Sequence, residues 1–233
     1  MKEEVVRQLD AGMEHQLARV RAEQDRGLPR IGWKVALNVP AVQKHLGLDG
    51  WVLGALPAAS ALVEPVFAVP PESRIHLEAE IAIRLGTSLP SRVTPEEAAE
   101  AIEGYAPAIE LVDYALPKDR GLAQISSHGF FHAASYVGGA YGGFHPIGPD
   151  FPVVFRNGEP VAQAVPELAL NDPAPIALGA ATLLERYDER LDGGDWILCG
   201  SLVQPVEAAP GDLFVVDFGP MGQIELRIEG EGE

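Results

Sequence analysis

Two β-hairpin patterns in the second half of the chain limit the folds that it can adopt. Residues 151–164 form two short apolar runs on either side of Asn157-Gly158, a dipeptide that favours a tight two-residue hairpin turn. Residues 212–228 contain a second strand pair that turns at Gly219 to Gly222. Strand patterns outnumber helix patterns, and the two do not alternate regularly along the chain. We therefore expect an antiparallel or mixed sheet architecture.

Helical periodicity is confined to a few segments. We expect helices over residues 3–25, 40–47 and 174–189, and one that begins at Thr94. Thr94 and Glu97 have the spacing of a capping box, with Pro95 at the first helical position. The first helix is amphipathic and is expected to pack on the outside of the fold or on a partner. The chain is thus predicted to comprise an N-terminal helix (1–30) and a single domain (31–233).

The composition excludes several functions. With 233 residues and 47% hydrophobic content, the chain can bury one sizeable core. Its net charge of -17 would repel a phosphate backbone or anionic lipid, so we expect no nucleic-acid partner. No apolar run has the length of a membrane span, and the N-terminus lacks the pattern of a signal peptide. Because the single cysteine, Cys199, cannot form an intramolecular disulfide, we expect a cytoplasmic protein.

Two glutamates interrupt an otherwise apolar strand pattern at residues 75–83. On extended backbone Glu78 and Glu80 point to the same face, with Cα atoms about 6.7 Å apart. Two like charges this close need a positive group between them, and oxygen ligands of this kind suit Mg²⁺ or Mn²⁺. A third acid, Glu110, lies inside the next predicted strand, 106–116, and is the candidate that completes the set.

The same residues have a plainer interpretation. The glutamate pair could lie on a solvent-facing strand edge, with ion pairs to Arg74 and Arg84. Lys34 lies on the small-residue face of a predicted strand, 31–37. There it could anchor a substrate carboxylate or simply reach to solvent.

Five segments occur in a fixed order along the chain. They are G-W-K-V-A-L (32–37), Q-K-H-L-G (43–47), L-E-A-E-I-A-I (77–83), A-I-E-L-V-D (108–113) and G-G-D-W-I-L-C-G-S-L (193–202). This order resembles the 2-keto-4-pentenoate hydratase branch of the fumarylacetoacetate hydrolase family. The resemblance implies an α/β fold of the α+β type, in which a mixed β-roll with flanking helices forms the catalytic domain. It also implies a bound Mg²⁺ or Mn²⁺ ion and assembly into homo-oligomers.

The resemblance assigns roles to individual residues. Glu78, Glu80 and Glu110 match the metal ligands, and Lys34 matches a lysine near the substrate. Ser201 falls in the family's Gly-[Ser/Thr/Ala]-Leu turn, which implies a hydrogen bond to the substrate carboxylate. The family's substrates are small 2-oxo acids or their enols, so the implied activity is hydration of a 2-hydroxy-2,4-dienoate.

The sequence departs from the hydratase pattern in two places. The stretch GALPAAS has Ala59 or a near neighbour where hydratases usually have an aspartate. The stretch SSHGFFHAASYVGG replaces an A-D-N-A-S-like loop and introduces His128 and His132. Either histidine could take over proton transfer, or could cap the loop or pack against its phenylalanines.

The missing aspartate leaves alternative functions open. Within enzymes these are a 2-oxo acid decarboxylase or an acylpyruvate-type C–C bond hydrolase. An alternative of another class is a catalytically degraded homologue that stabilises a partner enzyme.

Overall fold

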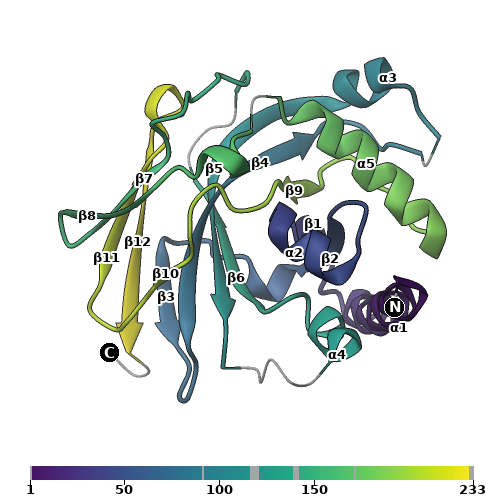
Figure 1. The fold of residues 1–233 in the computed structure, drawn as a ribbon, viewed down its shortest axis with the longest axis horizontal. Coiled ribbons are helices and arrows are strands. Elements are labelled where there is room, and N and C mark those ends of the chain that lie inside the picture. Colours follow the sequence, from purple (N-terminus) through teal and green to yellow (C-terminus); the bar gives the residue numbers. More distant parts are fainter. Residues whose placement is uncertain (1, 91, 116–120, 139–141, 171, 231–233) are drawn as a thin grey trace.

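The computed structural model describes residues 2–90, 92–115, 121–138, 142–170 and 172–230. Two sheets lie side by side in this part of the chain, and the longer helices gather beside the larger sheet, away from β11 and β12 (Figure 1). The helices are α1 (Lys2–Gln24), α2 (Pro40–Leu46), α3 (Pro95–Glu100), α4 (Leu122–Ser127) and α5 (Ala174–Leu184).

The larger sheet has the strand order β2-β1-β9-β4-β5-β6, with β10 paired to β4. Its strands are β1 (Arg30–Ala36), β2 (Val52–Pro57), β4 (Ile75–Leu85), β5 (Ile102–Asp113), β6 (His132–Val137), β9 (Trp196–Leu198) and β10 (Val206–Glu207). Most pairs are antiparallel, but β1 and β9 are parallel. The prediction of a mixed sheet with flanking helices is confirmed.

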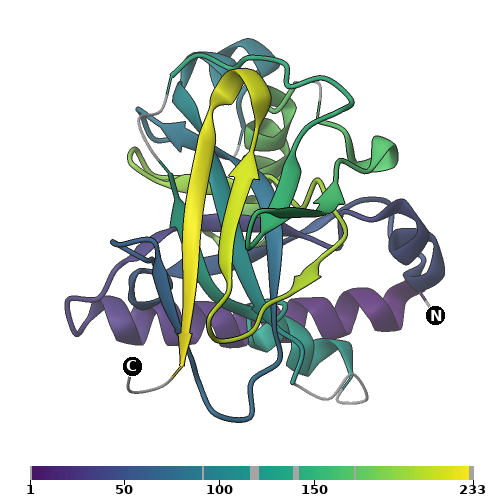
Figure 2. The ribbon, with the colours of Figure 1, turned by 90° about the vertical axis from the view of Figure 1, so that its left-hand side faces the viewer.

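The smaller sheet contains both predicted hairpins. Its order is β3-β12-β11-β7-β8, and the hairpin of β11 and β12 lies in front in Figure 2. The strands are β3 (Val66–Val69), β7 (Val153–Arg156), β8 (Glu159–Gln163), β11 (Leu213–Asp217) and β12 (Gln223–Gly230). Asn157 and Gly158 have φ angles of 54° and 88°, which is the left-handed pair that a type I′ turn requires.

Two apolar cores lie along the same face of β4. One lies between the helices and the sheet and includes Leu17 of α1, Trp33 of β1 and Ala177 of α5. The other lies between the two sheets, where Ile81 of β4 meets the cluster that contains Phe214 of β11. The odd-numbered residues of β4 therefore face apolar cores, which leaves its even-numbered glutamates on the opposite face.

The helix predictions are confirmed in their positions, but α5 ends at Leu184 instead of residue 189, and the helix that begins at Thr94 is short. The capping box of Thr94 and Glu97 is present, but α3 ends at Glu100, and β5 begins at Ile102 instead of Ala106. Helix α1 packs on α4 and β2 of its own chain. It approaches α4 closely at Gly12, where a Cβ atom would lie 2.4 Å from Ser126 Cβ.

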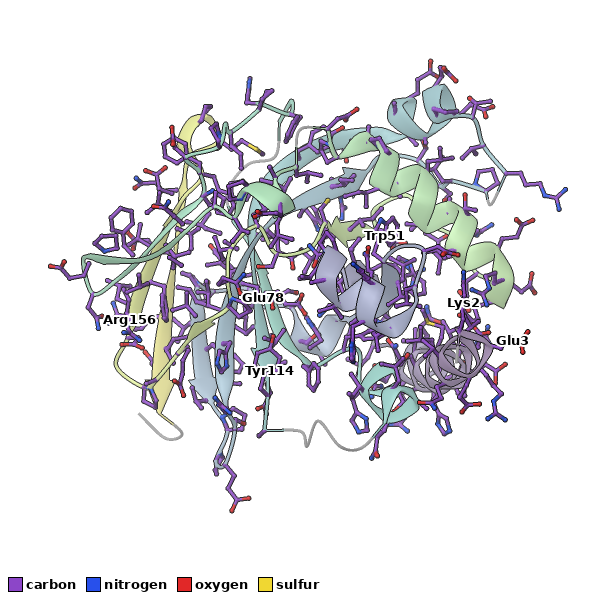
Figure 3. The ribbon with its side chains drawn as sticks, in the orientation of Figure 1. Lys2, Glu3, Trp51, Glu78, Tyr114 and Arg156 are labelled. Carbon is purple, nitrogen blue, oxygen red and sulfur yellow. The ribbon has the colours of Figure 1, made fainter. Side chains whose placement is uncertain are left out.

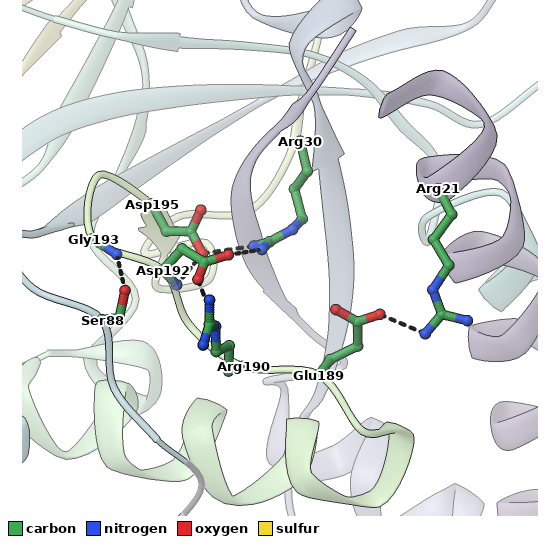
Figure 4. Close-up of polar contacts among 8 residues, drawn as sticks. All are labelled: Arg21, Arg30, Ser88, Glu189, Arg190, Asp192, Gly193 and Asp195. Carbon is green, nitrogen blue, oxygen red and sulfur yellow. Dashed lines mark hydrogen bonds and ion pairs between the residues drawn. The ribbon is translucent and has the colours of Figure 1, made fainter. Parts of the chain in front are cut away.

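A network of ion pairs holds the turn that precedes β9 (Figure 4). Arg30 Nη1 donates to Asp195 at 2.6 Å, and Nη2 donates to Asp192 at 3.1 Å. The guanidinium of Arg30 also lies over the ring of Trp33, 4.6 Å from its centroid. Because Asp195 immediately precedes β9, these contacts fix the strand that leads to the Gly200–Ser201 turn.

No helix in the described ranges is long and apolar enough to cross a membrane.

Candidate active site

The pairing of β4 with β5 brings three glutamates together. Glu78 lies directly opposite Glu110 in the antiparallel register, and Glu80 follows two residues later on the same face. One carboxylate oxygen from each residue lies within 4.8 Å of the others. The solvent-facing alternative is wrong, since Glu80 and Glu110 are both fully buried. The ion pair that the structure gives Arg84 is with Glu103, at 3.9 Å.

Burial makes this group of carboxylates electrostatically strained. Burial, followed by the charge of Glu110, raises the pKa of Glu78 to about 7. Burial and both neighbouring carboxylates raise the pKa of Glu80 well above its ordinary range. Burial also acts to raise the pKa of Glu110, but Lys34 and His132 outweigh it and lower that pKa. Glu110 is therefore the member of the group that carries the negative charge.

Two oxygens of this group have no hydrogen-bond partner in the described part of the chain. They are Glu80 Oε1 and Glu110 Oε2, and both are buried. A buried carboxylate oxygen without a donor is costly, whereas a divalent cation would satisfy it. Three carboxylates with two unsatisfied oxygens are a suitable donor set for Mg²⁺ or Mn²⁺.

Lys34 points into this group. It is only 3% exposed, so the interpretation that it reaches solvent is wrong. Its Nζ donates to Glu110 Oε1 and also to the carbonyl oxygen of Phe130 at 3.4 Å. Gly54, which is paired with Lys34 across β1 and β2, has no side chain and so leaves room for this path, because a Cβ there would lie 3.2 Å from Lys34 Cγ.

The structure separates the two loop histidines. His132 Nδ1 lies 2.8 Å from Glu110 Oε1, and its Nε2 lies 2.9 Å from Ser60 Oγ. His128 is exposed at the end of α4, with its Nδ1 2.9 Å from the carbonyl oxygen of Gln124. Within the described residues, no polar contact joins His128 to the three glutamates. Only His132 lies against the carboxylates.

The Gly200–Ser201 turn contacts the site through its backbone. The amide of Gly200 donates to Glu80 Oε2 at 2.8 Å. The hydroxyl of Ser201 donates instead to Val203 O within the turn, at 2.9 Å. Asn38 Nδ2 donates to the carbonyl of Ser201 at 3.2 Å. In this structure Gly200 makes the direct contact, and Ser201 lies one residue away.

Three residues that contact the site were not predicted from the sequence. Tyr114 Oη donates to Glu78 Oε1 at 3.4 Å, and Figure 3 shows both residues toward the middle of the molecule. Burial and the charge of Glu78 raise the pKa of Tyr114. Ser60 and Gly200 are the other two. Tyr114 could have been noticed because it follows Glu110 by four residues on the same strand pattern, and Ser60 because it is adjacent to Ala59.

A cavity of about 470 Å³ lies next to His132. Its walls include Arg19, Ser60, His128 and His132. Glu78, Glu80 and Glu110 are not among the described residues that line it.

The comparisons with known proteins agree on one family. The fumarylacetoacetate (FAA) hydrolase C-terminal family matches residues 44–229. The chain is 27% identical over 220 residues to a 4-oxalocrotonate decarboxylase of Pseudomonas sp, covering 89% of this chain and 82% of that protein. It is 29% identical over 212 residues to the 2-keto-4-pentenoate hydratase of Paraburkholderia xenovorans, covering 85% and 76%. With the 2-oxo-hept-4-ene-1,7-dioate hydratase of Escherichia coli, the identity is 29% over 229 residues, covering 89% and 82%.

A solved structure shares the fold. The 4-oxalocrotonate decarboxylase from Pseudomonas putida G7, complexed with magnesium and adipate, matches with a TM-score of 0.79 at 21% identity. The match covers 91% of this chain and 83% of that one. The expected fold class is confirmed.

Proposed function

The chain belongs to the fumarylacetoacetate hydrolase family, and from this premise we propose that it is a divalent-metal-dependent enzyme of small 2-oxo acids or their enols. Hydration of a 2-hydroxy-2,4-dienoate is the proposed reaction, by analogy with hydratase relatives at 29% identity. The observation that carries the proposal is the convergence of three carboxylates, two of them with an unsatisfied buried oxygen.

Glu78, Glu80 and Glu110 are proposed to hold Mg²⁺ or Mn²⁺. When bound, the ion supplies positive charge that stabilises the negative charge developing on the 2-oxo group of the substrate. The Gly200 amide orients Glu80 by donating a hydrogen bond to its carboxylate, and the Tyr114 hydroxyl does the same for Glu78.

Lys34 and the Gly200–Ser201 turn are proposed to orient the substrate carboxylate. Lys34 Nζ has three protons, and the two acceptors described for it leave one for a substrate oxygen. Because this remaining Nζ proton faces no protein acceptor described for it, we also assign proton transfer to Lys34. His132 uses both ring nitrogens within the protein, and His128 lies apart from the carboxylates, so neither is assigned direct contact with substrate.

Decarboxylation is the second candidate. The segment that lacks the hydratase aspartate has Ala59 and Ser60 in its place, and one relative is a decarboxylase. Decarboxylation breaks a C–C bond without adding water, so it does not require a group that activates water. The same ion and the same lysine would serve it.

The test compares two substrates with and without metal. Loss of the ultraviolet absorbance of 2-hydroxypenta-2,4-dienoate reports hydration, and CO₂ release from 4-oxalocrotonate reports decarboxylation. We expect Mn²⁺ or Mg²⁺ to be required for one of them, and a chelator to abolish it.

A matched pair of variants makes the test specific. Glu80→Gln is expected to reduce kcat/KM at least about a hundredfold, because it removes a proposed ligand. Glu103→Gln, on the same sheet but 44% exposed in its side chain, should act as wild type. If the wild-type protein binds the ion but converts no 2-oxo acid, including these two, the enzyme proposal fails in favour of a degraded, partner-stabilising homologue.

A further inference from the structure

The carboxylate of Glu110 is held by one of its two oxygens. Oε1 accepts from Lys34 Nζ and faces His132 Nδ1 at 2.8 Å, whereas Oε2 has no partner among the described residues. Two donors on one oxygen fix the rotation of the carboxylate about its terminal bond. The unsatisfied Oε2 belongs to the carboxylate that contributes to the group with Glu78 and Glu80.

His132 is itself held from the opposite side. Because an ionised carboxylate only accepts hydrogen bonds, Nδ1 of His132 must be the donor to Glu110. Nε2 then lies 2.9 Å from Ser60 Oγ, whose hydroxyl is also within 2.8 Å of the carbonyl oxygen of Pro57. Ser60 thus anchors the outer edge of the ring to the backbone of the segment after β2. The imidazole is clamped between a serine and a glutamate, and its side chain is only 4% exposed.

The backbone before His132 is bent at a conformational cost. Gly129, Phe130 and Phe131 have φ angles of 68°, 56° and 69°, so three successive residues are left-handed. For a non-glycine residue this conformation costs roughly 1–2 kcal/mol. Phe130 is 5% exposed in an apolar cluster with Leu9, which holds the turn in place. The turn directs the carbonyl of Phe130 to Lys34 and the ring of His132 to Glu110.

We propose that Ser60 and His132 are a positioning pair that orients Glu110 for the metal ion, with Ser60 acting through His132. This inference rests on the proposed metal site. Neither residue is assigned contact with substrate.

The test measures Mn²⁺ affinity by calorimetry, which does not depend on catalysis. Loss of an outer hydrogen-bond partner of a metal ligand typically weakens binding 10- to 100-fold. We expect Ser60→Ala and His132→Asn to raise the Kd about tenfold, since an Asn amide can still donate to Glu110 in place of Nδ1. His132→Ala should raise it about a hundredfold. Circular dichroism and the thermal midpoint of each variant verify that it is folded.

Ser127→Ala is the matched control. Ser127 Oγ lies 3.1 Å from His128 Nδ1, so this pair also joins a serine hydroxyl to an imidazole nitrogen, and among the described residues no polar contact links it to the glutamates. We expect wild-type Mn²⁺ affinity from it. The double variant Ser60→Ala/His132→Ala should bind Mn²⁺ no more weakly than His132→Ala alone, because Ser60 acts through His132.

Two results would overturn the inference and leave the proposed function intact. One is a wild-type Mn²⁺ Kd in both Ser60→Ala and His132→Ala. The other is an additive loss of affinity in the double variant, which would show that Ser60 acts independently. If wild-type protein itself takes up no Mn²⁺ or Mg²⁺, the proposed function fails first.

Discussion

At the scale of single residues, the three glutamates are not equivalent. Lys34 and His132 lower the pKa of Glu110, whereas Glu78 and Glu80 have raised pKa values because burial and their neighbours disfavour the charged form. Without an ion, the site is best described as one ionised carboxylate paired with Lys34, next to two acids that hold protons at mildly acidic pH. A cation that binds to the three carboxylates must displace the protons of Glu78 and Glu80.

Lys34 is the residue on which this charge distribution depends most directly. Lys34→Met removes the positive charge beside Glu110, so the pKa of Glu110 should rise. Breaking a buried ion pair by deleting one partner typically costs about 3–5 kcal/mol, and we expect a loss of this size in the free energy of unfolding without metal. Activity should fall at least about a hundredfold, as measured by kcat/KM on the substrate that wild type converts.

The exposed Lys44 of α2 provides the comparison for Lys34. Lys44→Met should leave both the unfolding free energy and kcat/KM close to wild type. Unchanged activity in Lys34→Met would contradict the role assigned to Lys34, even if the variant were less stable.

At the scale of secondary-structure elements, the site depends on the register of β4 and β5. The register pairs Glu78 with Glu110 and puts both on the face away from the core that contains Ile81. A slip of one residue would turn Glu110 to the opposite face, so the apolar alternation of both strands also specifies the site. For this reason the carboxylate group could be predicted from the sequence.

The turn after β9 offers a test of how an element positions Glu80, a proposed metal ligand. Gly200 has a φ of 96°, and a Cβ there would lie 2.6 Å from Asn38 Nδ2. Gly200→Ala should therefore both strain the backbone and displace the amide that donates to Glu80. Gly211 has a φ of 92° with nothing within 4 Å of its would-be Cβ. Gly211→Ala therefore tests the effect of backbone strain without a side-chain clash.

We expect Gly200→Ala and Gly211→Ala each to lose about 1–2 kcal/mol of stability from the left-handed conformation. Only Gly200→Ala should also weaken Mn²⁺ binding and lower kcat/KM. Chemical denaturation and calorimetry measure the two quantities separately. Equal Mn²⁺ affinity in the two variants would show that the turn does not position Glu80.

Other elements could not be predicted because their causes are tertiary. Helix α4 is short and lacks a side-chain cap at Gly121, so no local signal marks it. Left-handed phenylalanines are also unexpected locally, and Phe130 adopts this conformation because the apolar cluster around Leu9 buries its side chain. The contact of Ser60 with His132 joins segments 72 residues apart. Strand patterns predicted that the three glutamates come together, but not which residues contact them.

At the scale of the whole molecule, the site draws on much of the larger sheet. Lys34 comes from β1, the glutamates from β4 and β5, His132 from β6, and Gly200 from the turn after β9. Arg30 ties the approach to β9 onto β1 through Asp195. The geometry of the carboxylates therefore exists only when this sheet is assembled, so ion binding should stabilise the fold as a whole.

The pH dependence of stability follows from this coupling. Glu78 has a pKa of about 7 in the folded protein and an ordinary value of 4.5. Between these two values the folded state binds more protons than the unfolded state, so the free energy of unfolding falls as pH rises. The full loss, on the order of 3 kcal/mol from Glu78 alone, is reached above pH 7. Glu80 acts in the same direction, and Glu110 in the opposite one.

A bound divalent ion should remove this penalty, because it replaces the displaced protons with its own positive charge. We therefore expect Mn²⁺ to raise the thermal midpoint more at pH 8 than at pH 5.5. Metal-free Glu78→Gln should lose less stability than wild type over that pH range, since its amide does not titrate, and Glu103→Gln should follow wild type. An equal Mn²⁺-induced shift at both pH values would mean that binding displaces no protons, and that the raised pKa of Glu78 is not coupled to the ion.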